Sequence, residues 1–302
     1  MISTLRITQK MIRQTVLAGA LLVFASAAAQ AGNLSDVRRM IGSRDAILVQ
    51  SAAGQVLLAQ NEEKRLIPAS TLKVFTSLVA LHYLGADYRF HTDFFLDDNN
   101  NLKIKGYGDP LLISEVVATI GRELAGRLTA VENIVLDDSH FVQPLEIPGI
   151  SSSTQPYDAP NGALCVNFNT VFFKRLNGKY VSAEPQTPLM DFALQRIRRT
   201  GLSRGRVVLS QRQHECTLYA GHLFAHFMQA AGIEVRGRVI LGSVDESDTR
   251  IYRHLSGFTV EDIITRLLEH SNNFTTNQLL IAAGVAAFGP PGNLDKGVQV
   301  AR

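Results

Sequence analysis

The sequence has 302 residues, 46% of them hydrophobic and 19% charged, which is an ordinary globular composition that allows one large domain or two smaller ones. Lysine and arginine total 30, aspartate and glutamate total 27, and removing three N-terminal cations, Arg6, Lys10 and Arg13, leaves 27 against 27. A chain so close to neutrality lacks the basic surface of a nucleic-acid-binding protein, so we expect no nucleic-acid partner.

The first 31 residues have the pattern of a secretory signal peptide. The positive segment is followed by an apolar run from Val16 to Ala25, which is shorter than the roughly 20 residues that a membrane span needs. Ala29-Gln30-Ala31 has the small-x-small pattern that a signal peptidase recognises. The sequence therefore predicts a periplasmic protein cleaved after Ala31, with an uncleaved N-terminal anchor as the alternative.

The sequence gives little support to a metal site. It contains two cysteines, Cys165 and Cys216, and no C-x-x-C motif. A disulfide in an oxidising periplasm and two buried free thiols are both open. No H-E-x-x-H motif occurs, and the eight histidines lack the spacing of metal ligands. We therefore expect no zinc hydrolase.

The first elements of the mature chain are predicted to be a hairpin and a helix. Two strand patterns, 46–50 and 55–60, flank a small-residue turn. A helix is predicted from about Ser70 to Tyr83, with Gly85 as its C-terminal stop. Its apolar residues at helical spacing are Leu72, Val74, Leu78, Val79 and Leu81.

The middle of the chain has mostly strand patterns, and helices return near the C-terminus. Thr259 is expected to cap a helix that begins at Val260, and another helix is expected at 274–287. This order predicts a domain at 32–90 and 257–302, interrupted by a β-rich insert at 91–256. The other predicted elements are strands at 90–96, 102–107, 134–136, 166–173, 207–209 and 233–241, helices at 113–128 and 219–231, and a loop at 144–160.

Ser70-Thr71-Leu72-Lys73 is the most informative motif. Residues three apart share one face of a helix, so the Lys73 amine can reach the Ser70 hydroxyl. A serine hydroxyl becomes a nucleophile when a base takes its proton, and a partly desolvated lysine can serve. The helix N-terminus adds positive partial charge and free N–H groups. Because S-x-x-K also arises by chance and serine often caps helices, the motif is weak alone.

Ser271-Asn272-Asn273 is a second candidate motif, in a predicted turn between two helices. It offers a hydroxyl for proton transfer and an amide for binding a substrate backbone, although such residues often only cap helix ends. S-x-x-K followed by this tripeptide supplies two of the three motifs of serine penicillin-recognising enzymes. The combination, in this order, favours a serine acyl-transfer enzyme. Asp109, Asp137 and Asp138 lie in turn-like settings and are interpreted as structural.

Several segments resemble the D-alanyl-D-alanine carboxypeptidase/endopeptidase family, the class C low-molecular-mass penicillin-binding proteins. They cover nearly the whole mature chain, and the long separation of Ser70 from Ser271 is typical of the inserted domains of that family. In class A β-lactamases the two motifs lie closer together. The segments are Ile67–Thr76, Gly106–Leu111, Leu136–Phe141, Tyr157–Pro160, Tyr219–Gly221, Ala231–Ile233 and His270–Asn273.

The resemblance implies an α/β (α+β) fold with a penicillin-binding-protein-like catalytic domain. It also implies a serine-type D-Ala-D-Ala carboxypeptidase that needs no cofactor and acts on peptidoglycan stem peptides. Some members of the family are endopeptidases as well. Ser70 would be acylated, Lys73 would be the base, Ser271 would relay a proton to the leaving amine, and Asn273 would contact the substrate amide. β-Lactams would acylate the same serine.

The third family motif, Lys-Thr-Gly, is absent from the 302 residues. After Asn273 the only lysine is Lys296, followed by Gly297. We therefore expect a catalytic domain that is incomplete at its C-terminus. The alternative function is a truncated, catalytically impaired chain that binds peptidoglycan or serves as a scaffold. A second departure is Pro148–Thr154, where relatives tend to have aromatic and acidic residues and this chain has small hydroxyls.

Overall fold

A computed structural model describes residues 34–302 of the chain. The predicted signal peptide and its cleavage site lie outside these residues. The chain divides into two compact units, one ending at Pro68 and the other running from Ala69 to Arg302. No helix among residues 34–302 is long and apolar enough to cross a membrane.

The first unit contains the predicted hairpin. Strand β1 (Ile47–Gln50) pairs antiparallel with β2 (Val56–Gln60). The turn between them closes through a hydrogen bond from Ser51 N to Gln55 O of 2.9 Å, and Gly54 takes the left-handed conformation, with φ of 79°, that glycine adopts without steric cost. The hairpin predicted at 46–60 is confirmed.

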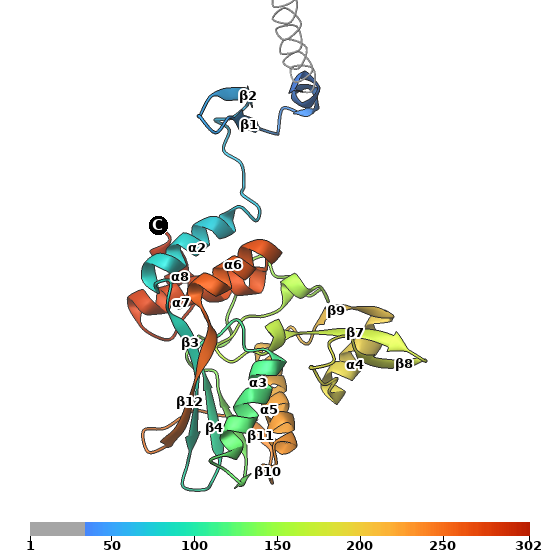
Figure 1. Ribbon diagram of the computed structural model, residues 1–302, viewed down its shortest axis with the longest axis vertical. Helices are drawn as coiled ribbons and strands as arrows, with labels where there is room; N and C mark the ends of the chain where they lie inside the picture. Colours follow the sequence, from blue (N-terminus) through green and yellow to red (C-terminus); the bar gives the residue numbers. More distant parts are fainter. Residues whose placement is uncertain (1–33) are drawn as a thin grey trace, which may run out of the picture. The chain divides into compact units, whose positions relative to one another are not determined.

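The second unit contains helices and strands in mixed order, as an α/β (α+β) fold requires (Figure 1). Its helices are α2 (Leu72–Tyr83), α3 (Ser114–Ala125), α4 (Asp191–Thr200), α5 (Gln213–Ala230), α6 (Val260–His270), α7 (Asn273–Phe288) and α8 (Leu294–Val300). Its strands are β3 (Arg89–Leu96), β4 (Leu102–Gly106), β5 (Ala130–Val131), β6 (Ile134–Asp137), β7 (Thr170–Leu176), β8 (Lys179–Ser182), β9 (Arg204–Val208), β10 (Glu234–Val235), β11 (Val239–Leu241) and β12 (Thr249–Thr259).

The largest sheet of this unit is mixed, with strand order β11-β6-β4-β3-β12. β3 pairs antiparallel with both β4 and β12, whereas β6 pairs parallel with β4 and β11. Helices α3 and α5 pack against each other and cover one face of this sheet (Figure 1). A smaller sheet has the order β8-β7-β9, and β5 and β10 form a short parallel pair.

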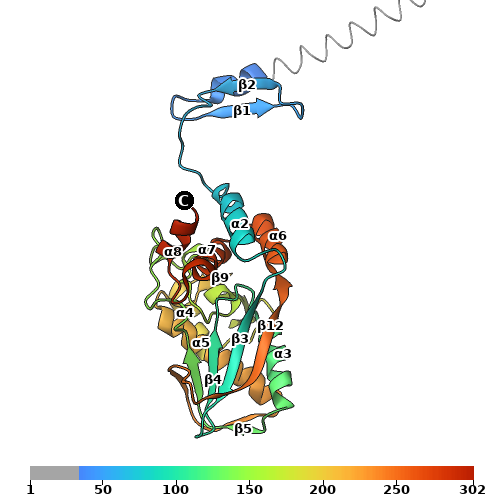
Figure 2. The ribbon, with the colours of Figure 1, turned by 90° about the vertical axis from the view of Figure 1, so that its left-hand side faces the viewer.

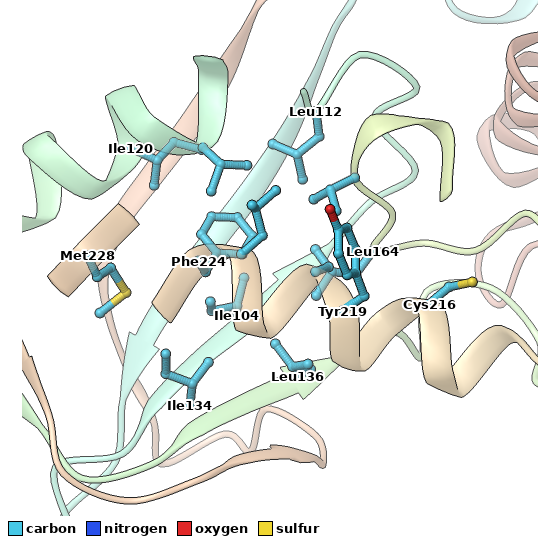
Figure 3. Close-up of a cluster of buried hydrophobic side chains, with 14 of the residues drawn as sticks. Ile104, Leu112, Ile120, Ile134, Leu136, Leu164, Cys216, Tyr219, Phe224 and Met228 are labelled. Atoms are coloured by element: carbon cyan, nitrogen blue, oxygen red, sulfur yellow. The ribbon is translucent and has the colours of Figure 1, made fainter. Parts of the chain in front are cut away.

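The main hydrophobic core lies between the five-stranded sheet and helices α3 and α5. Ile104 and Leu136 of the sheet meet Tyr219 and Phe224 of α5, and all four are at most 1% exposed (Figure 3). Full burial of such a side chain stabilises the fold by about 1.5–3 kcal/mol relative to an exposed one. The alternating inward residues of each strand therefore fix which face of the sheet the helices cover.

A second core holds α2, α6 and α7 together at one end of the sheet (Figure 2). Ala80 of α2 packs with Ile263 of α6 and Leu279 of α7, and each is fully buried. Phe90 at the start of β3 belongs to the same cluster. This packing fixes the N-terminus of α2 against the turn between α6 and α7, where the candidate motifs lie.

The structure corrects some of the predicted details. Within the second unit, α2 packs through Val79 and Ala80, whereas Val74 and Leu78, predicted on its apolar face, lie away from the core. The patterns do not predict α4, α8, β5, β8 or β12. The helices predicted at 113–128 and 219–231 are confirmed as α3 and α5, and α5 begins six residues earlier than predicted. Strands β3 and β12 cross the boundaries predicted for the insert at 91–256, and that division of the chain stays a prediction.

Candidate active site

Ser70 lies in the turn that begins α2. Leu72 N donates to Ala69 O and Lys73 N donates to Ser70 O, each at 3.0 Å, so the turn winds directly into the helix. The helix itself begins at Leu72, two residues later than predicted. Ser70 is exposed, and its hydroxyl therefore lies at the positive end of the helix dipole with access to solvent.

Lys73 brings its amine to the Ser70 hydroxyl, as the spacing of the motif predicts. Its Nζ donates to Ser70 Oγ at 3.1 Å and to Asn273 Oδ1 at 2.8 Å. The residue is only 7% exposed, and burial lowers the pKa of the Lys73 ammonium from its usual 10.5, because desolvation disfavours the charged form. A lysine in this setting yields a neutral amine more readily than one on the surface.

Ser271 completes the contacts to Ser70 from the other side of the site. Its Oγ donates to Ser70 Oγ at 2.8 Å, across 201 residues of sequence. Ser271 ends α6 in the left-handed region, with φ of 52° and ψ of 44°, which is uncommon for a residue other than glycine. The packing of α6 and α7 in the second core holds this conformation and aims the hydroxyl at Ser70.

Asn272 and Asn273 have different structural roles. Asn272 is the N-cap of α7, and its side chain accepts a hydrogen bond from Thr275 N at 3.1 Å, which is the capping role considered from sequence. Asn273 is the first residue of the helix and its Oδ1 accepts from Lys73. Within residues 34–302 its amide nitrogen makes no hydrogen bond and can donate to a ligand.

Two cavities flank these residues. The first, the Lys73 cavity, has a volume of about 260 Å³ and is lined by Lys73, Asn273, Tyr157 and the loop 147–150. The second, the Ser271 cavity, has a volume of about 530 Å³, and Ser271, Asn273 and Tyr157 are among the residues that line it. Lys73 and Ser271, which line one cavity each, are the two residues that hydrogen-bond to Ser70 Oγ.

Two hydroxyls of the 148–154 loop, those of Ser151 and Ser153, are used for structure. Ser151 Oγ donates to Asp158 Oδ2 at 2.6 Å and Ser151 N donates to Asp158 Oδ1 at 2.9 Å, and Ser153 Oγ bonds to the same carboxylate. Burial favours a higher pKa for the Asp158 carboxyl, but these bonds together outweigh burial and lower the pKa. The small hydroxyls therefore fix the loop that carries Tyr157 into both cavities.

The remaining polar residues noted in the sequence lie away from Ser70. Asp137 pairs with Lys105 at 3.0 Å, and Asp138 accepts a hydrogen bond from Leu164 N, so both are structural. Cys165 and Cys216 are buried and free. Lys296 Nζ donates to the carbonyl oxygens of Gly289 and Pro291 at 2.7 and 2.8 Å and holds a loop.

Sequence reasoning missed two residues beside the site, Phe168 and Arg206. Both line the Ser271 cavity. Arg206 comes from β9 and is held by a hydrogen bond to Thr170 Oγ1 of 3.1 Å and an ion pair with Glu184. No local motif marks either residue, because their position depends on how the β8-β7-β9 sheet packs against the α6–α7 turn.

Comparison with known proteins assigns the family. The sequence profile of the D-Ala-D-Ala carboxypeptidase 3 (S13) family matches residues 27–204 and 203–302. The chain belongs to this family. The family resemblance predicted from the sequence motifs is thereby confirmed.

Individual relatives support the assignment. The S13 chain is 24% identical over 300 residues to a D-alanyl-D-alanine carboxypeptidase of Actinomadura sp. (strain R39), in an alignment covering 83% of this chain and 56% of that protein. It therefore spans little more than half the length of this curated relative.

Solved structures show the same fold. Penicillin binding protein 4 (dacB) of Haemophilus influenzae matches with a TM-score of 0.66 and 19% identity, covering 89% of this chain and 69% of that one. The same protein complexed with a novel β-lactam matches with a TM-score of 0.59 and 19% identity, covering 89% and 67%. The predicted penicillin-binding-protein-like α/β fold is confirmed.

Proposed function

We propose that this chain is a periplasmic serine-type D-Ala-D-Ala peptidase that acts on peptidoglycan stem peptides through an acyl-enzyme on Ser70. The observation that carries the proposal is the convergence of Lys73 Nζ and Ser271 Oγ on Ser70 Oγ, at 3.1 and 2.8 Å. Membership of the S13 family supports the same reaction. The nucleophile and its base lie within hydrogen-bond reach, as covalent catalysis requires.

The chemistry begins with transfer of the Ser70 proton to a neutral Lys73 amine. Ser70 Oγ then forms a bond to the carbonyl carbon of the penultimate D-alanine, and the C–N bond to the terminal D-alanine breaks. The proton passes from Lys73 to the leaving amine through the Ser271 hydroxyl, which lies 2.8 Å from Ser70 Oγ. Water hydrolyses the ester and restores Ser70.

The substrate would be held beside these groups by the Asn273 amide. Because Asn273 Oδ1 already accepts from Lys73, its nitrogen is the atom that would donate to the substrate backbone. N–H groups at the start of α2 would stabilise the oxyanion. A relative of the same fold has been solved with a β-lactam bound, and we infer that β-lactams acylate Ser70 in this chain as well.

The proposal is tested by measuring D-alanine release from a synthetic peptide that ends in D-Ala-D-Ala. We expect release by the wild-type protein and a loss of about a thousandfold or more in Ser70→Ala, since the nucleophile acts as a unit with its base. Ser203→Ala, which alters an exposed serine outside the cavities, is the matched control and should retain activity. Equal release by Ser70→Ala and wild type would refute the proposed role of Ser70.

A further inference from the structure

A third cavity lies between α6, the start of α3 and the turn that precedes β7. We call it the α3–α6 cavity. Its volume is about 230 Å³, smaller than those of the Lys73 and Ser271 cavities, and we expect a small molecule as its occupant. None of Ser70, Lys73 and Ser271 lines it.

Two solvent-exposed side chains of opposite charge line this cavity. Arg266 of α6 stacks its guanidinium 4.8 Å from the centre of the Phe258 ring, and Glu115 lies in the first turn of α3. Among residues 34–302, neither is within ion-pair distance of an opposite charge. The other charged pair of the lining, Arg206 and Glu184, is already neutralised. The cavity therefore offers one cation and one anion to a ligand.

The floor of the α3–α6 cavity is apolar and fixed. Ile263 and Leu267 form its base and belong to the core beneath α6, with exposures of 0% and 1%, so the base cannot move aside. The apolar surface open to a ligand belongs to the half-buried Ile113, Phe168 and Phe258. A short apolar side chain would lie against these residues.

The wall formed by Phe168 is rigid. Phe168 is left-handed, with φ of 57° and ψ of 25°, which is an outlier for a bulky residue. The neighbouring Asn167 holds it through two bonds with Ser114, from Ser114 N to Oδ1 and from Nδ2 to Ser114 Oγ, both 2.9 Å. Backbone strain that is maintained by such a network is found most often at functional sites.

We propose that the α3–α6 cavity binds a free α-amino acid with a small aliphatic side chain. Its carboxylate would pair with Arg266, its ammonium with Glu115, and its side chain would lie against Ile113 and Phe258. The cavity shares Phe168, Arg206, His270 and Asn272 with the Ser271 cavity. An occupant therefore contacts the residues on either side of Ser271. The class includes D-alanine, and that link to the reaction product rests on the proposed function.

The test is calorimetric titration of the full chain as the Ser70→Ala variant, so that binding is measured without turnover. We expect D-leucine to bind more tightly than D-alanine, by about fourfold for each additional buried CH₂. D-Alaninamide lacks the carboxylate and propionate lacks the ammonium, and each should bind about tenfold more weakly or worse.

Variants of the two charges give a second measurement. Arg266→Gln and Glu115→Gln should each weaken D-leucine binding about tenfold, whereas Arg198→Gln on α4 and Glu123→Gln on α3, outside the lining, should bind as the parent does. A flat titration, or equal binding of D-leucine in all four variants, overturns the proposal. Because the titration needs no catalysis, its outcome is separate from that of the D-alanine release assay.

Discussion

At the scale of single residues, the site is organised around one oxygen atom. Ser70 Oγ accepts hydrogen bonds from Lys73 Nζ and Ser271 Oγ, and Lys73 Nζ also donates to Asn273 Oδ1. As long as Lys73 is an ammonium it can only donate to Ser70. Loss of one proton from Lys73 would let its nitrogen accept the Ser70 hydroxyl proton, as the proposed mechanism requires.

The state of Lys73 gives a prediction on pH. Burial lowers the Lys73 pKa, and the proposed base is the neutral amine. The rate of acylation by a β-lactam should therefore rise with pH, with a midpoint below 10.5 for this rising limb of the profile. The measurement is the second-order acylation rate constant as a function of pH. In Lys73→Arg, where the side chain stays charged, the limb should vanish. A wild-type rate that is independent of pH would contradict this role.

The contact between Asn273 and Lys73 gives a second prediction, on the midpoint of the pH–rate profile. Asn273→Asp places a carboxylate 2.8 Å from the ammonium, which favours the charged form and should move the midpoint to higher pH, by about one unit or more. Asn272→Asp is the matched control, since aspartate caps a helix as well as asparagine does and the Asn272 side chain bonds to Thr275 N instead of Lys73. An unchanged midpoint in Asn273→Asp would show that this contact does not control the base.

The four candidate residues could be predicted from sequence because their chemistry is local to two short motifs. Spacing alone places Lys73 beside Ser70, and the order of the motifs brings in Ser271. The left-handed conformation of Ser271 and the wall of Phe168 and Arg206 could not be predicted, since no local pattern encodes them. They depend on packing between segments far apart in the chain.

At the scale of elements, the helices that carry the motifs are fixed by their caps. Thr259 and Asp262 form a reciprocal capping box at the start of α6, and the cap at Thr259 was predicted from the sequence.

Strand β12 was not predicted, because its register against β3 is broken by two irregularities and its alternation is therefore interrupted. The apolar residues of α2 also predicted the wrong buried face for that helix. Its buried side includes Lys73, Thr76 and Ser77, which are polar and therefore do not contribute to an apolar pattern.

The cap of α6 has a measurable contribution to stability. Thr259→Ala should lower the free energy of unfolding by about 1 kcal/mol, because Asp262 N loses its side-chain acceptor. Thr265→Ala, in the exposed middle of the same helix, should change it by less than about 0.5 kcal/mol. Both are measured by urea denaturation. Equal changes in the two variants would show that the capping box contributes nothing specific.

The loop between β4 and α3 contains a buried carboxyl group with a distinct pH signature. Burial raises the pKa of Asp109 from 3.8 to about 6 and outweighs the hydrogen bond from Leu111 N, which opposes the change. Between these two values the folded state binds more protons than the unfolded state. The free energy of unfolding therefore falls with rising pH through this window, in total by about 2–3 kcal/mol from this group.

Asp109→Asn tests this assignment. Its Oδ1 can still accept from Leu111 N, while the ionisable group is gone. Chemical denaturation of both proteins at several pH values from about 4 to 7 should show that the variant gains stability relative to wild type as pH rises. The difference between the two curves removes the contribution of other titrating groups. Parallel curves would mean that Asp109 titrates normally.

At the scale of the whole molecule, the fold class and the family were accessible from sequence, whereas the topology was not. Motifs spread from Ile67 to Asn273 carry the family resemblance, and the S13 match covers residues 27–302. The pairing of β3 with β12, in which Arg253 bonds to Asp93 from 160 residues away in sequence, and the parallel pairing of β4 with β6 join segments that no local periodicity connects. The α3–α6 cavity follows from these non-local contacts.

The central claim is that Ser70 of this chain is a nucleophile. Its most direct test is to incubate the folded protein with a fluorescent penicillin and to locate the adduct by mass spectrometry, with penicillin binding protein 4 of Haemophilus influenzae as the positive control. The account predicts one covalent adduct, on Ser70, that is absent in Ser70→Ala and present in Ser203→Ala. A folded protein that takes no label while the relative is labelled, or an adduct on another residue, would contradict it.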